Sequence, residues 1–255
     1  YKYLFRAGIE PATRSAARIR LAEEQEDTQS RIVGGSTSSL GQFPYQVIHQ
    51  FRRVCGGSLI RANRVLTAAH CWFDGQNQAF SLVVVLGSVR LFSGGTRVST
   101  SNIIMHGNWN PHVIRDDVAV IRLGSNVDNI ALIALPSGSQ LNELFMGETA
   151  IASGFGASGA ITTNQGLSHV TLPVITNVVC RSSFPLIIQD SNICTSGAGG
   201  RSICQGDSGG PLTYLFKLFL QIGISSFVSA RGCQVGAPAG FARVTSYASW
   251  INGHL

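Results

Sequence analysis

The segment Gly206–Leu212 reads Gly-Asp-Ser-Gly-Gly-Pro-Leu and places a serine among glycines. Glycines allow the backbone to turn sharply, which leaves the hydroxyl of Ser208 and the neighbouring backbone amides exposed. A serine needs this exposure, together with an adjacent base, to act as a nucleophile. Taken alone, such a segment is more often an ordinary loop rich in glycine, serine and proline. Chemistry at Ser208 therefore depends on whether the chain also supplies a base and an acid.

Candidates for the base and the acid lie in two earlier segments. His70 follows Thr-Ala-Ala and precedes Cys71, and the acidic pair Asp116-Asp117 stands at the start of an apolar run. By itself a single histidine is more often structural, and an acidic pair is more often solvated. The chain order His70, Asp117, Ser208, however, is the chymotrypsin order and differs from that of other Ser-His-Asp enzymes. Together the three segments indicate a serine nucleophile with its base and its acid.

From residue 32 to residue 255 the sequence resembles the chymotrypsin/trypsin family of serine peptidases. The resemblance rests on motifs that occur in family order: Ile32-Val33-Gly34-Gly35, Cys55-Gly56-Gly57-Ser58-Leu59, Thr67-Ala68-Ala69-His70-Cys71, Asp116-Asp117-Val118-Ala119-Val120, Gly206-Asp207-Ser208-Gly209-Gly210-Pro211-Leu212 and Phe241-Ala242-Arg243-Val244. Three further phrases look most like insect digestive chymotrypsins and are also similar to insect and crustacean collagenolytic enzymes: Trp72-Phe73-Asp74-Gly75, Val84-Val85-Leu86-Gly87-Ser88 and Ser229-Ala230-Arg231-Gly232-Cys233.

The resemblance implies an all-β fold, with two perpendicular six-stranded antiparallel β-barrels, a C-terminal α-helix and the site between the barrels. Six cysteines, with no C-x-x-C pair and no histidine at metal-ligand spacing, indicate three disulfides formed in an oxidising compartment. Spacing alone leaves fifteen pairings open. The resemblance selects Cys55–Cys71, Cys180–Cys194 and Cys204–Cys233.

The resemblance also implies a role for each candidate catalytic residue. Ser208 is expected to attack the scissile carbonyl while His70 takes its proton, and Asp117 is expected to orient and stabilise His70. Asp116 is the weaker acid candidate, because the matching position in the family is commonly an asparagine. The backbone N–H groups of Gly206 and Ser208 are expected to bind the developing oxyanion.

Substrate binding is implied at a second group of positions. By family alignment Ser202 forms the base of the specificity pocket, at a position where trypsins carry an aspartate, and Val228 and Ala239 form its walls. Ser226 is expected to support Asp117, and the segment Ser226-Phe227-Val228 is expected to pair with the substrate backbone by strand addition.

Activation is implied by the sequence around Ile32. A cut between Arg31 and Ile32 creates a new ammonium group, which is expected to turn inward and pair with the carboxylate of Asp207. A buried charge is tolerated only with a partner. Arg31 supplies the basic residue that a trypsin-like activating protease requires.

The elements that must position these residues are mostly strands. Short apolar runs bounded by glycine, serine, threonine and asparagine predict strands near residues 81–86, 102–105 and 118–123. The most apolar stretch, residues 211–228, is broken by Lys217 and Gln221, so it predicts two strands and no transmembrane helix. Close to the C-terminus, Thr245 is expected to cap a helix over residues 246–253.

Composition divides the chain into two parts. Residues 1–31 hold no cysteine and are charge-dense, which is typical of a solvated leader, so they are interpreted as an activation propeptide. Residues 32–255 are expected to form the peptidase domain, with the divide between two β units near residues 136–147.

Charge and ligand types exclude several other functions. The formal net charge of +6 comes from scattered cationic residues that are almost never beside aromatic ones, so no nucleic-acid partner is expected. The loop Gly87–Gly95 carries no carboxylate, and hard cations require such oxygens. We expect no metal, no cofactor and no membrane partner.

The sequence thus predicts a secreted, extracellular serine endopeptidase of the gut lumen that is monomeric and cleaves proteins after uncharged apolar or aromatic residues. Its expected partners are protein and peptide substrates, an activating trypsin-like protease and proteinaceous inhibitors. Two alternatives stay open: a catalytically inactive, peptidase-like binding protein, and a regulatory protease with a narrow substrate. The intact set His70, Asp117, Ser208 and Gly206 argues against the first, and a leader without a cysteine-framed adaptor domain argues against the second.

Overall fold

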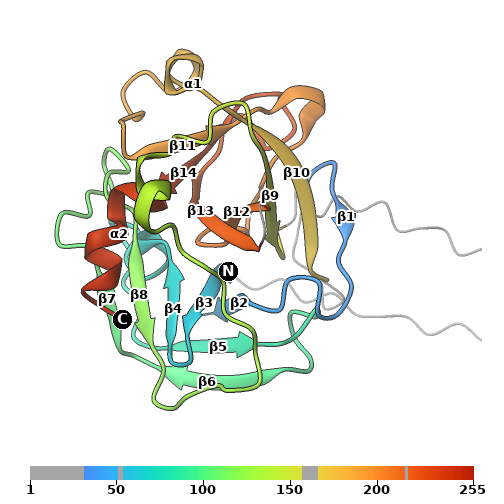
Figure 1. Cartoon of the computed structure of the whole chain (residues 1–255), viewed down its shortest axis with the longest axis vertical. Coiled ribbons are helices and arrows are strands. Elements are labelled where there is room, and N and C mark those ends of the chain that lie inside the picture. The colour runs from blue at the N-terminus through green and yellow to red at the C-terminus, as the bar shows by residue number, and fades with distance from the viewer. Residues whose placement is uncertain (1–31, 51–53, 157–165, 216–217) are drawn as a thin grey trace, which may run out of the picture.

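The structure is a computed structural model that describes residues 32–50, 54–156, 166–215 and 218–255. These residues form two antiparallel β-sheets, one above the other in Figure 1, with two short α-helices at the periphery. The first sheet is built from residues 46–122, and the second takes its long strands from residues 149–243. The predicted all-β class is confirmed.

The first sheet has the strand order β6-β5-β2-β3-β4-β8-β7. Its strands are β2 (Gln46–Gln50), β3 (Val54–Arg61), β4 (Arg64–Thr67), β5 (Leu82–Leu86), β6 (Thr96–Thr100), β7 (Ile103–Met105) and β8 (Ala119–Arg122). The edge strands β6 and β7 are separated by residues 101–102 alone. They are therefore two parts of one bent strand, which closes the sheet into a barrel of six strands when it is counted once.

The second sheet has the order β1-β10-β11-β14-β13-β12-β9, and β9 also pairs with β10. Its strands are β1 (Ser36–Thr37), β9 (Thr149–Gly154), β10 (Ser168–Ile175), β11 (Asn192–Thr195), β12 (Pro211–Leu215), β13 (Phe219–Phe227) and β14 (Ala239–Arg243). The additional β9–β10 pairing closes a ring of six strands. The short strand β1 is added on the outside of β10.

Hydrophobic burial holds each barrel together, since alternate residues of a strand point to one face. In β10 the buried residues Val170, Leu172 and Val174 alternate with more exposed ones and pack inside the second barrel. A further cluster of buried residues joins the two barrels, and it includes residues from β2, β8, β13 and the C-terminal helix.

Polar side chains also join the barrels. The hydroxyl of Ser58 in β3 donates to Oε1 of Gln221 in β13 at 2.6 Å, and Ser153 in β9 donates to Oε1 of Gln46 in β2 at 2.7 Å. All four residues are buried. Buried hydrogen bonds of this kind require one relative placement of the two barrels, because a shift would leave polar groups unpaired.

The two α-helices are α1 (Asn177–Ser183) and α2 (Val244–Asn252). The prediction for α2 was wrong at its start, because Thr245 lies inside the helix and Arg243 is the N-terminal flanking residue. The chain passes from β14 straight into α2, and the buried Val244 begins the helix. No side chain caps it. None of the helices in the described residues is long and apolar enough to cross a membrane.

Other local predictions agree with the structure. The runs 81–86, 102–105 and 118–123 contain β5, β7 and β8, and the stretch 211–228 contains the two strands β12 and β13. The structure forms the disulfides Cys55–Cys71, Cys180–Cys194 and Cys204–Cys233, which are the pairs that the resemblance implied. The connection between the barrels runs over residues 123–148.

Candidate active site

His70 lies just beyond β4, in a 3-10 helix of one turn, Ala69–Cys71. The disulfide from Cys55 in β3 to Cys71 holds the end of this turn. Nδ1 of His70 lies 2.7 Å from Oδ2 of Asp117, and the backbone N–H of His70 donates to Oδ1 at 2.9 Å. The two contacts fix both the position and the orientation of the imidazole, and Nε2, on the side of the ring away from Asp117, lies 4.0 Å from Sγ of Cys71.

Asp117 is 2% exposed and directly precedes the buried residues of β8. The hydroxyl of Ser226 at the end of β13 donates to Oδ2 of Asp117 at 2.5 Å. Burial raises the pKa of Asp117, but the contacts with His70 and Ser226 outweigh burial and hold the pKa below its usual range. The lowered pKa favours the ionised carboxylate of Asp117, which is suited to stabilise a positive charge on His70.

Asp116 points elsewhere. Its backbone has a φ of 58°, in the left-handed region, and its carboxylate accepts a hydrogen bond from the hydroxyl of Tyr247 in α2 at 3.0 Å. The two acids therefore have different partners: Asp117 contacts His70, and Asp116 contacts Tyr247 of the C-terminal helix.

The loop that carries Ser208 is packed against β3 and β13. The carbonyl of Ser208 accepts from the N–H of Gly56 at 2.7 Å, and the N–H of Gly209 donates to the carbonyl of Ser225 at 2.7 Å. A Cβ atom at Gly209 would collide with Oγ1 of Thr67, and the φ of Gly209 is 77°. Glycine at this position thus allows the loop to lie against the segment that leads to His70.

Two backbone N–H groups beside Ser208 are free to bind an anion. Residues 204–207 form a turn in which the N–H of Asp207 donates to the carbonyl of Cys204 at 3.0 Å. Gly206 lies in this turn with a φ of 96°. Within the described part of the chain, the N–H groups of Gly206 and Ser208 donate to no acceptor. These two unpaired N–H groups, on the residues before and after Asp207, are suited to donate hydrogen bonds to an oxyanion.

The carboxylate of Asp207 points away from Ser208 into the protein and is fully buried. It accepts from the N–H of Gly156 at 2.8 Å and from the N–H of Cys204 at 2.8 Å. Burial raises the pKa of Asp207 to about 7, against the lowering effect of the two N–H donors. In the structure as described, the site of Asp207 is therefore suited to receive a cation.

Ile32 is connected to this carboxylate through Gly156. Its side chain is 1% exposed, and its backbone N–H donates to the carbonyl of Gly156, the residue that also donates to Asp207, at 3.1 Å. Val33 pairs with Ser202 through two backbone hydrogen bonds of 3.0 and 3.2 Å. The predicted activation residue Arg31 lies outside the described residues.

The predicted substrate-binding residues lie in and beside the second barrel. Ser202 and Ala239 are buried, and Val228 is partly buried against the interior of that barrel. The ring of Phe227 lies over Gly240, where a Cβ atom would collide with it. Phe184 meets that ring edge-on, with a centroid distance of 5.2 Å.

Three supporting residues escaped the sequence reasoning. At Gly154 and Gly156 a Cβ atom would collide with the carboxylate of Asp207, so both glycines make room for it. Buried His49 in β2 lies behind the His70 turn, with Nε2 at 2.9 Å from Oγ1 of Thr67. Nothing in the sequence around these residues links them to the serine segment, because the contacts span the fold.

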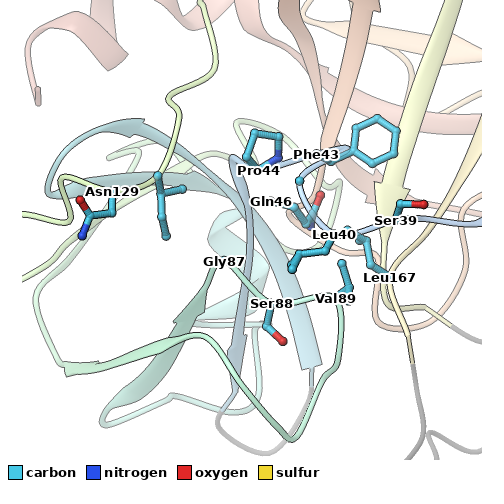
Figure 2. Close-up of a pocket in the computed structure, with 12 residues that line it drawn as sticks. Ser39, Leu40, Phe43, Pro44, Gln46, Gly87, Ser88, Val89, Asn129 and Leu167 are labelled. Carbon is cyan, nitrogen blue, oxygen red and sulfur yellow. The ribbon is translucent and has the colours of Figure 1, made fainter.

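Two other features do not belong to this site. Nδ1 or Nε2 of His49 and the sulfurs of Cys55 and Cys71 lie within 4.8 Å of one another, but both sulfurs form the disulfide and cannot act as thiolate ligands. A cavity of about 130 Å³ beside the exposed Leu40 is lined by residues before and at the start of β2, by residues that follow β5, and by Asn129, Ile130 and Leu167 (Figure 2). None of the candidate catalytic residues lines it.

Comparisons with known proteins identify the class. The family model described as Trypsin matches residues 32–251. The chain is 43% identical over 232 residues to a protein named Collagenase from Hypoderma lineatum, a match that covers 88% of this chain and 86% of the relative. It is 37% identical over 230 residues to Brachyurin from Leptuca pugilator, a match that covers 86% of this chain and 96% of the relative. It is 35% identical over 251 residues to human chymotrypsin-like elastase family member 1, a match that covers 90% of this chain and 94% of the relative.

A solved structure titled HL collagenase superposes with a TM-score of 0.79 at 42% identity, over 88% of this chain and 98% of the other. The chain therefore belongs to the trypsin family of serine proteases. Its substrates are proteins, and its fold is the trypsin-like pair of β-barrels.

Proposed function

We propose that this protein is a secreted digestive endopeptidase in which Ser208 is the nucleophile, His70 the general base and acid, and Asp117 the residue that orients and stabilises His70. The observation that carries the proposal is the buried Asp117 carboxylate, which contacts Nδ1 of His70 at 2.7 Å and accepts from Ser226 at 2.5 Å. A fixed imidazole and a partly buried serine on a glycine-rich loop are the parts that acyl transfer requires.

In this mechanism the Ser208 hydroxyl attacks the scissile carbonyl and transfers its proton to Nε2 of His70. The N–H groups of Gly206 and Ser208 bind the oxyanion, and His70 then passes the proton to the leaving amine. Water, activated by the same histidine, releases the acyl group. Beyond β13, the backbone of Val228 makes no hydrogen bond to other described residues, which supports pairing with an extended substrate.

Activation by cleavage after Arg31 follows from the surroundings of Asp207. This carboxylate is buried without a cationic partner among the described residues. It accepts from the N–H of Gly156, whose carbonyl in turn accepts from the backbone N–H of Ile32. A new ammonium at Ile32 would supply the missing charge and order the adjacent N–H groups of Gly206 and Ser208. The uncut chain is then nearly inactive.

The pocket is proposed to accept uncharged apolar side chains, with leucine, methionine and smaller groups competing well against phenylalanine and tyrosine. Ser202 at its base offers no counter-charge to lysine or arginine, and Val228 and Ala239 narrow the space for a flat ring. The names collagenase and elastase among the relatives support a preference broader than aromatic residues alone.

A covalent probe tests the catalytic assignment. After cleavage with a trypsin-like protease, a serine-directed fluorophosphonate should label the protein, and Ser208→Ala should abolish labelling while Ser182→Ala, at an exposed serine of α1, should not. Arg31→Gln should leave the protein uncut, unlabelled and inactive. Labelled wild type without any cleavage of a peptide library, or failure of the cut protein to label, would favour the inactive binding protein instead.

A further inference from the structure

Of three buried hydroxyl groups on strands of the second barrel that have no hydrogen-bond partner among the described residues, two lie on the strands that flank β14. They are Oγ of Ser225 in β13 and Oγ1 of Thr195 in β11, in side chains that are 1% and 0% exposed. A buried hydroxyl without a partner carries a free-energy cost. Such a cost is expected to persist only where a ligand or water satisfies the group.

Strand register places both hydroxyls beside the proposed specificity pocket. Ser225 is paired with Phe241 of β14, and Thr195 is paired with Ala239 of the same strand. Directly opposed residues of an antiparallel pair point to the same face of a sheet. Phe241 and Ala239 are both buried inside the barrel, so Ser225 and Thr195 point inward with them.

The position of Ser225 also links it to the nucleophile. Its carbonyl accepts from the N–H of Gly209 at 2.7 Å, and its N–H donates to the carbonyl of Gly210 at 2.9 Å. Ser225 therefore lies across from the residues that directly follow Ser208, while Thr195 lies beside the Ala239 wall. Buried Ser202 adds a third hydroxyl at the base of the pocket.

We propose that Ser225 and Thr195 are specificity-determining residues, and that the pocket accepts glutamine in addition to apolar side chains. This inference rests on the proposed function, because the pocket is the one assigned there. A hydroxyl can donate or accept, and a carboxamide offers both an acceptor and two donors. Glutamine is uncharged and unbranched, so it matches a pocket that lacks a counter-charge and is narrowed by Val228.

Cleavage of matched peptides tests the inference in the processed enzyme. Two substrates differ only in glutamine or leucine before the scissile bond, and the measured quantity is the ratio of their kcat/KM values. Ser225→Ala and Thr195→Val each remove one hydroxyl with little change of shape. Ser168→Ala is the matched control, because Oγ of Ser168 is also buried and without a partner, but lies at the end of β10 remote from β11.

The wild type should cleave after glutamine within about tenfold of leucine, and either pocket variant should lower the glutamine-to-leucine ratio about tenfold. A fall in one variant alone assigns the contact to that hydroxyl. Ser168→Ala should leave the ratio within about twofold. The inference is overturned if both pocket variants keep the wild-type ratio, or if the wild type cleaves after leucine and not after glutamine. Loss of cleavage after every residue would instead contradict the proposed function.

Discussion

The carboxylate of Asp207 fits against the backbone of Gly156, whose N–H donates to Oδ1 at 2.8 Å and whose Cα leaves no room for a side chain. The carbonyl of the same glycine accepts from the N–H of Ile32. Gly156 thus links Ile32, at the proposed cleavage site, to Asp207, which lies between the two residues whose N–H groups are proposed to bind the oxyanion.

Replacing Gly156 with alanine should disturb this junction. The added methyl group would displace the Asp207 carboxylate, and overpacking of this kind costs about 1–3 kcal/mol. We expect Tm to fall by about 3–10 °C and the activity of the processed enzyme to fall with it. Gly124→Ala is the control, since a Cβ there meets nothing within 4 Å. Equal effects of the two substitutions on Tm and kcat/KM would contradict the role of Gly156.

Asp207 should give the uncut Arg31→Gln chain a distinctive pH dependence. Its pKa is raised to about 7 in the folded chain, from 3.8 for the free group. Between these values the folded state holds a proton that the unfolded state has lost, so the free energy of unfolding should fall as pH rises from about 4 to about 7. Asp207→Asn should flatten this slope in urea titrations. A steeper slope in the Asn variant would refute the assignment.

His49 should act in the opposite direction in the processed enzyme. Burial is the main cause that lowers its pKa to about 4, from 6.5 for the free group. Between about pH 4 and pH 6.5 the imidazole of His49 is protonated in the unfolded state but neutral in the folded state. The free energy of unfolding should therefore fall by about 2–3 kcal/mol as pH falls from about 6.5 to about 4. His49→Gln should reduce this loss, and the exposed His112→Gln should not. Identical acid unfolding curves for the three proteins would exclude His49 as the cause.

Ser226→Ala should weaken catalysis without abolishing it. The substitution removes the hydroxyl that donates to Oδ2 of Asp117 and leaves the contact of Asp117 with His70 in place. We expect kcat to fall about tenfold with little change in KM, because the lost contact orients His70 in the transition state. Steady-state kinetics on one peptide measure both values. A rise in KM with unchanged kcat would instead place Ser226 in substrate binding alone.

Val228→Gly should widen the proposed pocket. A change of this size in an apolar pocket is worth roughly 1–3 kcal/mol, so kcat/KM for phenylalanine relative to leucine should rise about tenfold. The comparison uses peptides that differ in that residue only. An unchanged ratio would mean that Val228 does not set specificity.

Much of this protein follows from its sequence. The glycines around Ser208, the chain order His70, Asp117, Ser208 and the even number of cysteines can be read directly from the sequence. Short apolar runs predicted β5, β7, β8, β12 and β13 because their length and the polar and turn-forming residues that bound them are visible in the sequence. The resemblance to a family then supplied the barrels and the disulfide pairing, which spacing could not.

Only the tertiary structure decided the contacts that cross the fold. The resemblance to the family favoured Asp117 over Asp116, and the structure shows the contacts that separate them, because Asp117 contacts His70 and Asp116 accepts from Tyr247. The sequence did not indicate that Gly156 accommodates Asp207, or that the hydroxyls of Ser225 and Thr195 face inward without partners. These relationships join residues that lie far apart in the chain, and they depend on strand register, which becomes visible only after the barrels have closed.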